Sequence, residues 1–346
     1  MTADDLAARH LCPGILTHPL GLHCNVVADG ASAGGPTGTD RFLAVLHRAV
    51  AQGATFVDTS DSYGNGHSER VIGRLLRTRP DLRLHLSSKV GQVRGSAEHP
   101  YAGRHIHHQL EQSLDNLYAE QLHLYTLDSF DFGPGDRYLG NAIETMHTLR
   151  DVESIKAIGM RGPFARYGAS PEEWAAQADR FLHLFRLIKP DVVWATFNAF
   201  TPVVSLDGED LFTFTARHGV GLVLGSPLAH GMLAGKAISR TAPSPGFTAT
   251  AQPFMGRIEE DLHSLRVAFG DAPGTLMRLA LRSSLQRGEQ CVVVVGFTDE
   301  GQIDETYGCL GRPLTPLELS VVDGVYASLR AHLEGPGELS GQALPG

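Results

Sequence analysis

The sequence lacks an excess of basic residues, a long hydrophobic run and closely spaced cysteines. Its 346 residues include 38 acidic and 29 basic side chains, giving a formal net charge of -9. Proteins that bind nucleic acid in general need positive charge to neutralise phosphates, so the composition argues against a nucleic-acid partner. The longest apolar stretches, such as 290–296, are far shorter than the roughly 20 residues that span a bilayer.

The cysteines are few and widely separated, at Cys12, Cys24, Cys291 and Cys309. No CxxC pair occurs, which gives a zinc site or a disulfide framework little support and favours buried thiols. The first residues lack the basic start and apolar core of a secretory signal, so we expect a cytoplasmic protein. Its expected partner is a small-molecule substrate, with no membrane partner, and the sequence leaves the oligomeric state open.

A histidine cluster near residue 105 is the other pattern that could suggest a metal. His105, His107 and His108 stand at i, i+2 and i+3 of a predicted helix start, positions that do not converge on one ion. We therefore expect a solvated surface there and no metal site.

What the sequence does contain is an alternation of short β-rich runs with longer segments of helical spacing. Candidate strands cover 20–24, 55–59, 82–88, 123–127, 155–159, 191–196, 221–224 and 291–295, and the last expected helix spans 299–310. A strand followed by a helix, repeated eight times, predicts a single-domain α/β protein, a (β/α)8 TIM barrel over 1–334 with a disordered tail at 335–346. A doubly wound open sheet is the alternative, but no GxGxxG turn follows the first strands.

Two finer expectations concern helix and loop boundaries. Ser68 is predicted to cap the helix that runs to Thr78, because a serine precedes its apolar positions. The segment 227–252 is rich in glycine, proline, serine and threonine, which indicates an active-site lid or flexible loop.

Polar side chains stand at the carboxyl ends of three consecutive predicted strands. Asp58 ends the second strand, Lys89 the third and Asp128 the fourth, and Tyr63 follows on the turn after Asp58. In a barrel of this type the chemistry lies at this end of the strands. Because neighbouring strands are about 4.8 Å apart, the four side chains can meet in one pocket.

This combination of side chains suits proton donation to a carbonyl oxygen. A buried lysine next to a tyrosine lowers the pKa of the phenol, and a carboxylate keeps the lysine charged. Reduction of a carbonyl needs such a donor as hydride arrives at the carbon. The alternative is that Asp58 and Lys89 form a purely structural ion pair and Tyr63 packs under a loop.

The segment from Thr55 to Gly73, with Asp58, Tyr63 and the run Gly64-Asn65-Gly66, resembles the signature block of the aldo-keto reductases. Further similar segments follow in the same order, at 88–91, 109–117, 192–198, 226–236 and 294–298. The resemblance spans about residues 15 to 312. It implies an NAD(P)H-dependent reductase on a TIM barrel, in which Asp58, Tyr63 and Lys89 are three of the four catalytic residues and Tyr63 is the general acid.

The fourth catalytic position, normally histidine, is Asp128, and several cofactor positions also depart from the family pattern. Arg161 and Gly162 replace a Ser-Asn pair, Trp194 replaces a glutamine, and Gly225 replaces the aromatic residue that stacks on the nicotinamide. The resemblance implies cofactor contacts at Arg161, Trp194, Ser226, Leu228, Gly296, Phe297, Thr298, Gln302 and Glu305.

The choice between NADP and NAD stays open at this point. NADP is the family default, but Gln302 stands where many NADPH-preferring members have an arginine for the 2'-phosphate, and Asp299 and Glu300 are acidic. The missing arginine removes one charge-assisted phosphate contact. Backbone donors after the seventh and eighth strands can still hold a pyrophosphate.

Asp128 admits two interpretations. If another carboxylate and burial raise its pKa, it becomes a neutral donor that polarises a carbonyl or enone oxygen. If it stays ionised against Lys89, it acts as a base, which favours oxidation, isomerisation or elimination. His67, just after the turn that carries Tyr63, is a candidate to contact substrate or take over proton transfer.

Three hypotheses follow for the function. The favoured one is an oxidoreductase that moves hydride between a nicotinamide cofactor and a small carbonyl, enone or alcohol. A second keeps the barrel but makes the protein a non-redox lyase or isomerase using Tyr63, Lys89 and Asp128, because the nicotinamide contacts are altered. A third is a catalytically weak regulatory or binding homologue.

Overall fold

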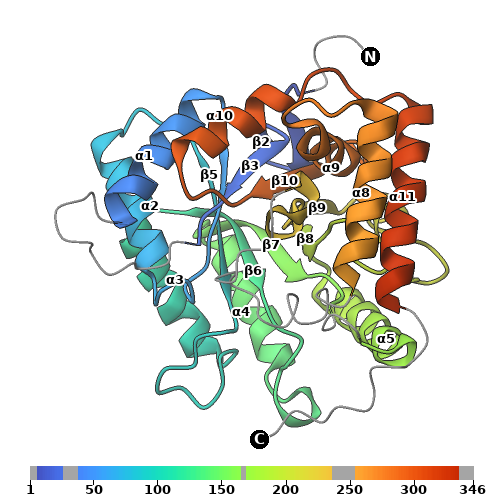
Figure 1. Ribbon diagram of the computed structural model, residues 1–346. Helices are drawn as coiled ribbons and strands as arrows, with labels where there is room; N and C mark the ends of the chain where they lie inside the picture. Colours follow the sequence, from blue (N-terminus) through green and yellow to red (C-terminus); the bar gives the residue numbers. More distant parts are fainter. Residues whose placement is uncertain (1–5, 26–37, 165–168, 236–253, 335–346) are drawn as a thin grey trace, which may run out of the picture.

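The computed structural model describes residues 6–25, 38–164, 169–235 and 254–334, and these residues form a closed parallel barrel (Figure 1). The strand order around the barrel is β10-β3-β4-β5-β6-β7-β8-β9. The barrel strands are β3 (Leu20–His23), β4 (Phe56–Asp58), β5 (His85–Val90), β6 (Leu122–Leu127), β7 (Ile155–Arg161), β8 (Val192–Thr196), β9 (Gly221–Gly225) and β10 (Cys291–Val295). Their apolar side chains are nearly all buried, as expected for strands covered on both faces. The predicted (β/α)8 fold is confirmed.

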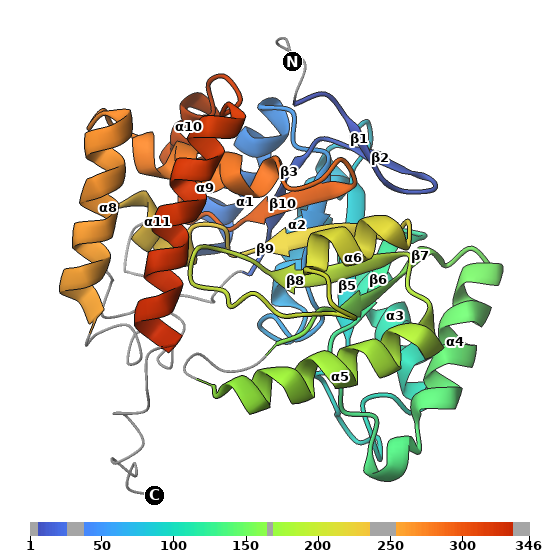
Figure 2. The ribbon, with the colours of Figure 1, turned by 90° about the vertical axis from the view of Figure 1, so that its right-hand side faces the viewer.

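Helices surround the barrel and cover its outer face (Figures 1 and 2). They are α1 (Gly38–Ala51), α2 (His67–Thr78), α3 (Gly103–Leu117), α4 (Leu139–Asp151), α5 (Pro171–Ile188), α6 (Leu211–Arg217), α8 (Met255–Phe269), α9 (Thr275–Leu285), α10 (Glu300–Cys309) and α11 (Pro316–Glu334). Two short 3-10 helices, η1 (Pro134–Asp136) and η2 (Ala229–Ala234), lie in the loops. Among the described helices, none has the length and apolar content that a membrane crossing requires.

The amino-terminal end of the barrel is closed by a hairpin that sequence reasoning did not predict. Strands β1 (Arg9–Cys12) and β2 (Ile15–Thr17) pair antiparallel, and Leu11 and Ile15 pack into the barrel interior. A Cβ atom on Gly221 would lie 2.0 Å from the Leu11 carbonyl oxygen. Only glycine therefore lets the hairpin approach β9 so closely.

The pair of helices α8 and α11 also lies outside the repeated βα units. They pack side by side (Figures 1 and 2) and bury Leu262, Leu265, Val322 and Leu329 in a second apolar cluster. Helix α11 begins after the last helix that the sequence predicted, so its existence was missed. The lid or loop expected over 227–252 is described only as far as Gly235, where η2 packs Ala229, Met232 and Leu233 into the second apolar cluster. Its remaining residues and the tail at 335–346 lie outside the described part.

The predicted start of α2 is wrong. The helix begins at His67, its N-cap is Gly66 with φ 75°, and Ser68 lies fully buried inside the first turn. The loop enters the helix through a left-handed residue, a conformation that favours glycine, so a serine cap cannot form there.

The histidine cluster on α3 differs in part from its expectation. His107 and His108 are exposed, but His105 is buried and its Nε2 lies 2.8 Å from the Val93 carbonyl oxygen. Over the described ranges, no group of three or more His, Cys, Asp or Glu side chains is arranged to hold a metal ion.

Candidate active site

Asp58 is the centre of a buried polar cluster at the carboxyl end of β4. Its Oδ2 accepts hydrogen bonds from Lys89 Nζ at 2.7 Å, His23 Nδ1 at 2.9 Å and Trp194 Nε1 at 3.1 Å. Its Oδ1 accepts one from Ser87 Oγ at 2.8 Å. Burial alone would raise the pKa of Asp58, but Lys89 and His23 together outweigh it and lower that pKa. Asp58 is therefore ionised.

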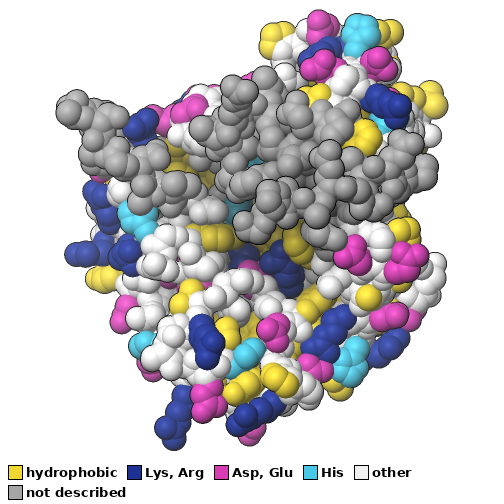
Figure 3. All heavy atoms as spheres, turned by 60° about the horizontal axis from the view of Figure 1, so that its bottom comes forward, with side chains coloured by type: hydrophobic (Ala, Val, Ile, Leu, Met, Phe, Trp, Pro, Cys, Tyr) yellow, Lys and Arg dark blue, Asp and Glu magenta, His cyan; other side chains and the backbone are white. Residues whose placement is uncertain are grey.

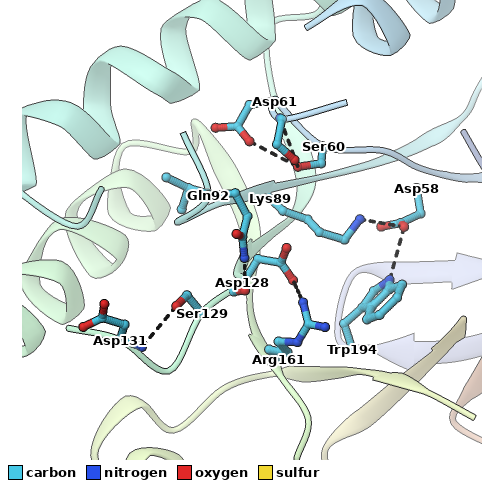
Figure 4. Close-up of polar contacts among 12 residues, drawn as sticks. Asp58, Ser60, Asp61, Lys89, Gln92, Asp128, Ser129, Asp131, Arg161 and Trp194 are labelled. Carbon is cyan, nitrogen blue, oxygen red and sulfur yellow. Dashed lines mark hydrogen bonds and ion pairs between the residues drawn. The ribbon is translucent and has the colours of Figure 1, made fainter. Parts of the chain in front are cut away.

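Lys89 stands on the neighbouring strand β5 and is equally buried. Its Nζ donates to Asp58 (Figure 4) and, at 2.6 Å, to the carbonyl oxygen of Thr59. Burial would lower the pKa of Lys89, but the charge of Asp58, followed by Tyr63 and Asp128, raises it above its ordinary value. The ammonium group is therefore charged at neutral pH and places a positive charge beside Tyr63.

Tyr63 lies on the turn between β4 and α2, held by backbone bonds from its N–H to the Ser60 carbonyl and from Ser68 N–H to its own carbonyl. Lys89 Nζ is 5.3 Å from the centroid of its ring. The expected direction of its pKa is wrong, because burial raises the pKa of Tyr63 by more than Lys89 lowers it. The phenol thus retains its proton at neutral pH.

Asp128, at the end of β6, pairs with Arg161 and not with Lys89. Arg161 Nη1 lies 3.0 Å from Asp128 Oδ1 (Figure 4). The Arg161 guanidinium also packs over the Phe164 ring, 4.6 Å from its centroid. Gln92 donates to the Asp128 carbonyl oxygen at 2.8 Å. Burial raises the pKa of Asp128, and Arg161 opposes that rise more than Lys89 does. The net direction is a raised pKa, as in the first of the two interpretations. The pairing with Lys89 in the second interpretation is replaced by the pairing with Arg161.

A cavity of about 590 Å³ opens beside Tyr63. Its polar lining comes from Ser62, Tyr63, Gln92, Asp128, Ser129, Arg161 and Gln177. Phe130 and Phe164 supply apolar surface. In the space-filling view of this side of the molecule, acidic and basic side chains lie together in a hollow (Figure 3). The cavity gives a small polar ligand access to the Tyr63 side chain.

Trp194 and Gly225 form a coupled pair next to this cluster. A Cβ atom on Gly225 would lie 2.7 Å from two indole carbons of Trp194. The missing side chain at 225 therefore makes room for the indole, whose centroid is 5.1 Å from Lys89 Nζ. An aromatic residue is retained at this part of the barrel mouth, although it comes from β8 and not from β9.

The other residues expected to contact a cofactor follow β9 and β10. Ser226 and Gly296 are exposed at the ends of these strands, whereas Phe297 is buried and Leu228 is half-buried against the core. Ser226 has φ 58°, and its carbonyl oxygen accepts a hydrogen bond from Asn198 Nδ2 at 3.1 Å. These residues lie at the end of the barrel that carries Asp58 and Lys89.

Helix α10 begins with an acidic, self-capped turn. Asp299 accepts from the Gln302 N–H at 3.0 Å, and the Gln302 side chain is bonded to Thr298 Oγ1 at 2.7 Å. Glu300 lies in the first turn and Glu305 is exposed farther along. An additional anion at this N-terminus would meet carboxylates.

Comparison with known proteins identifies the family of the chain. The model of the aldo/keto reductase family matches residues 30–327. The chain belongs to this family. Family membership makes it an oxidoreductase that depends on a nicotinamide cofactor, NAD or NADP.

Similar aldo-keto reductases include an L-galactose dehydrogenase from Arabidopsis thaliana, 24% identical over 293 residues that cover 82% of this chain and 84% of the relative. A probable aldo-keto reductase from Glycine max is also 24% identical, covering 80% of this chain and 77% of the relative. Among solved structures, a glycerol dehydrogenase from Gluconobacter oxydans has a TM-score of 0.71 at 22% identity, covering 99% and 100% of the two chains. An aldo/keto reductase from Klebsiella pneumoniae in complex with NADP and acetate has a TM-score of 0.60 at 18% identity, covering 92% and 95%. At these identities the structural matches show the shared fold.

Two residues bonded to Asp58, His23 and Ser87, were missed by sequence reasoning. The sequence pointed to His67, whose Nε2 instead lies 3.3 Å from Thr39 Oγ1. His23 ends β3 just as Asp58 ends β4. Applying the rule of carboxyl-terminal strand ends to the first barrel strand would have found it.

Proposed function

We propose that the protein transfers hydride between a nicotinamide cofactor and a small, neutral, hydroxylated carbonyl or alcohol, with Tyr63 as the general acid and base. The observation that carries this proposal is the half-buried phenol between a charged lysine and a polar cavity. The cofactor, when bound, supplies or accepts the hydride.

Each member of the cluster has a definable task in the reducing direction. Tyr63 donates its hydroxyl proton to the carbonyl oxygen, which becomes the alcohol. Lys89 stabilises the tyrosinate that is left, because its charge favours the ionised phenol. Asp58 keeps Lys89 charged and fixed in position. In the oxidising direction the tyrosinate accepts the alcohol proton.

The substrate class follows from the charge and chemistry of the cavity. Arg161 is paired with Asp128, so the pair offers little net positive charge to a substrate carboxylate. Hydroxyl and amide groups of Ser62, Gln92 and Gln177 line the same cavity and suit neutral hydroxyl groups. The names of two similar proteins, an L-galactose dehydrogenase and a glycerol dehydrogenase, indicate hydroxylated substrates and support this choice.

We further propose NAD as the preferred cofactor. Trp194 is bonded to Asp58 at this end of the barrel, and Ser226 and Gly296 are exposed where a dinucleotide could bind, so the residues present fit such a group. The first turn of α10 does not fit an added 2'-phosphate, because Asp299 already caps it and Glu300 lies beside it. Carboxylates suit ribose hydroxyls better than a phosphate.

The test compares NADH and NADPH with a panel of small aldoses, hydroxyketones and polyols, following nicotinamide absorbance. We expect turnover with NADH to exceed turnover with NADPH in kcat/KM. Tyr63→Phe should lower kcat/KM by about 10²- to 10⁴-fold, the usual contribution of a positioned acid.

Tyr118→Phe provides the matched control, because Tyr118 is 65% exposed and is not part of the cavity lining. Conversion of a substrate without cofactor would instead favour the lyase or isomerase hypothesis. Full activity of Tyr63→Phe would refute the role given to the phenol.

A further inference from the structure

The proton that Tyr63 delivers has to be replaced in every turnover, and most of the cluster behind Tyr63 is sealed from water. Asp58 and Lys89 have side-chain exposures of 0% and 1%. Trp194 and Ser87 are also buried. His23 differs, because its side chain is 22% exposed while its Nδ1 is bonded to Asp58.

His23 touches the cluster at the atom that also holds the lysine. Both His23 Nδ1 and Lys89 Nζ lie within 3 Å of Asp58 Oδ2, at 2.9 and 2.7 Å. Because an ionised carboxylate only accepts hydrogen bonds, the imidazole donates through Nδ1. The ring also packs edge-on against Tyr63, with centroids 5.4 Å apart and planes at 78°.

The position where the family usually has its histidine cannot perform this task here. Asp128 is paired with Arg161 at 3.0 Å. A guanidinium is not deprotonated in proteins, so this pair offers no exchangeable proton from the cation. His67 bonds to Thr39 and is likewise not connected to Asp58 by any interaction among the residues that the structure describes.

We propose that His23 is the proton-return residue of the active site, linking water to the Asp58–Lys89 pair. This inference rests on the proposed function.

After Tyr63 has given its proton to the substrate oxygen, Lys89 transfers one Nζ proton to the tyrosinate. A proton moves from His23 Nδ1 to Asp58 Oδ2 and from there to Lys89 Nζ. His23 takes a proton from water at its other ring nitrogen, and exchange with water restores its first tautomer. The net result is one proton from water for each proton delivered.

The experiment separates delivery of the proton from its return. His23→Asn keeps an N–H near the Nδ1 position to bond Asp58 but has no second basic nitrogen to exchange protons with water. A single turnover of pre-bound cofactor and substrate uses the proton already on Tyr63, whereas repeated turnover needs the return step.

We expect His23→Asn to leave the single-turnover rate within about twofold of the wild type and to lower steady-state kcat by about tenfold or more, within the range of general acid–base effects. The solvent deuterium isotope effect on kcat should increase, because proton return becomes rate-limiting. His67→Asn is the matched control and should change neither rate.

A second variant protects the test from a folding failure. Added imidazole should restore kcat of His23→Ala in a concentration-dependent manner while leaving His67→Ala unchanged. An unchanged steady-state kcat in His23→Asn would overturn the proposal. Equal losses in the single-turnover and steady-state rates would also overturn it, because they would show that His23 only positions Asp58. Failure of the proposed function is distinguishable, because Tyr63→Phe would then leave the single turnover intact.

Discussion

Two buried carboxylates three residues apart, Asp58 at the end of β4 and Asp61 on the loop that follows, have opposite electrostatic surroundings. Asp58 is completely buried and accepts from four side chains, one of them the charged Lys89. Asp61 is 6% exposed, accepts from Ser60 Oγ at 3.1 Å, and its Oδ2 is buried without a hydrogen-bond partner among the described residues.

The pKa values of the two groups diverge accordingly. Burial raises the pKa of Asp61 to about 7, and the nearby Glu69 adds to this rise. Asp58 shows the opposite net direction although it is more deeply buried. The comparison shows that the partners of a buried carboxylate, and not its depth, decide whether it stays charged.

The largest expected effect comes from removing the charge of Asp58. Asp58→Asn leaves Lys89 buried without its counter-charge, so the free energy of unfolding should fall by about 3–5 kcal/mol. Activity should fall by at least about 10²-fold, because Lys89 loses its position. Chemical denaturation and steady-state kinetics check the two effects.

The control for this change is the double variant Asp58→Asn with Lys89→Met, which removes both charges. It should recover part of the lost stability but none of the activity. Equal stability of the single variant and the wild type would show that the pair is not buried in the way described.

The second prediction concerns Asp61, where removing the carboxylate should raise the free energy of unfolding at high pH instead of lowering it. Because its folded-state pKa of about 7 exceeds the ordinary 3.8, the folded protein binds more protons than the unfolded chain between about pH 4 and 7. The stabilising contribution of the protonated form is complete below pH 4 and is lost as pH rises to 7. The total loss amounts to at most about 4 kcal/mol, at 1.36 kcal/mol per pKa unit.

Asp61→Asn removes this dependence, so the variant should be more stable than the wild type at pH 8 and similar near pH 4. Denaturant unfolding as a function of pH measures both curves. If the free energy of unfolding changed by the same amount between pH 4 and 7 in the wild type and in Asp61→Asn, the raised pKa of Asp61 would be contradicted.

The smallest effect is expected from weakening one of the neutral contacts of Asp58. Ser87→Ala removes the hydroxyl that donates to Oδ1 at 2.8 Å and should cost about 1.5 kcal/mol of unfolding free energy, a value typical of a hydrogen bond to a charged group. Activity should stay within about threefold, since Lys89 and His23 remain bonded to Oδ2. A loss of activity as large as that of Asp58→Asn would show that neutral donors, and not Lys89, hold the carboxylate in its active position.

The sequence predicted the barrel and the meeting of Asp58, Tyr63 and Lys89. Strand and helix periodicity selects the fold, and a parallel barrel brings all carboxyl-terminal strand ends to one face. The positions of these three residues follow from topology alone, without any knowledge of side-chain packing.

Features that depend on packing depth could not be predicted in the same way. The raised pKa of Tyr63 results from a balance between burial and Lys89, and the length of the Arg161 side chain lets it reach Asp128 from β7. The Trp194 indole on β8 occupies the space that a side chain at Gly225 on the adjacent strand β9 would need. None of these relations leaves a signal at fixed spacing in the chain.

The β1–β2 hairpin has a consequence for the order of events in each catalytic cycle. Because it seals one end of the barrel and apolar side chains fill the interior up to Trp194, cofactor and substrate must use the opposite opening in both directions. When two ligands bind through the same opening, the ligand nearer the opening blocks dissociation of the deeper one. We therefore expect ordered binding and release, in which the ligand that binds last dissociates first and dissociation of the deeper ligand limits the rate of turnover.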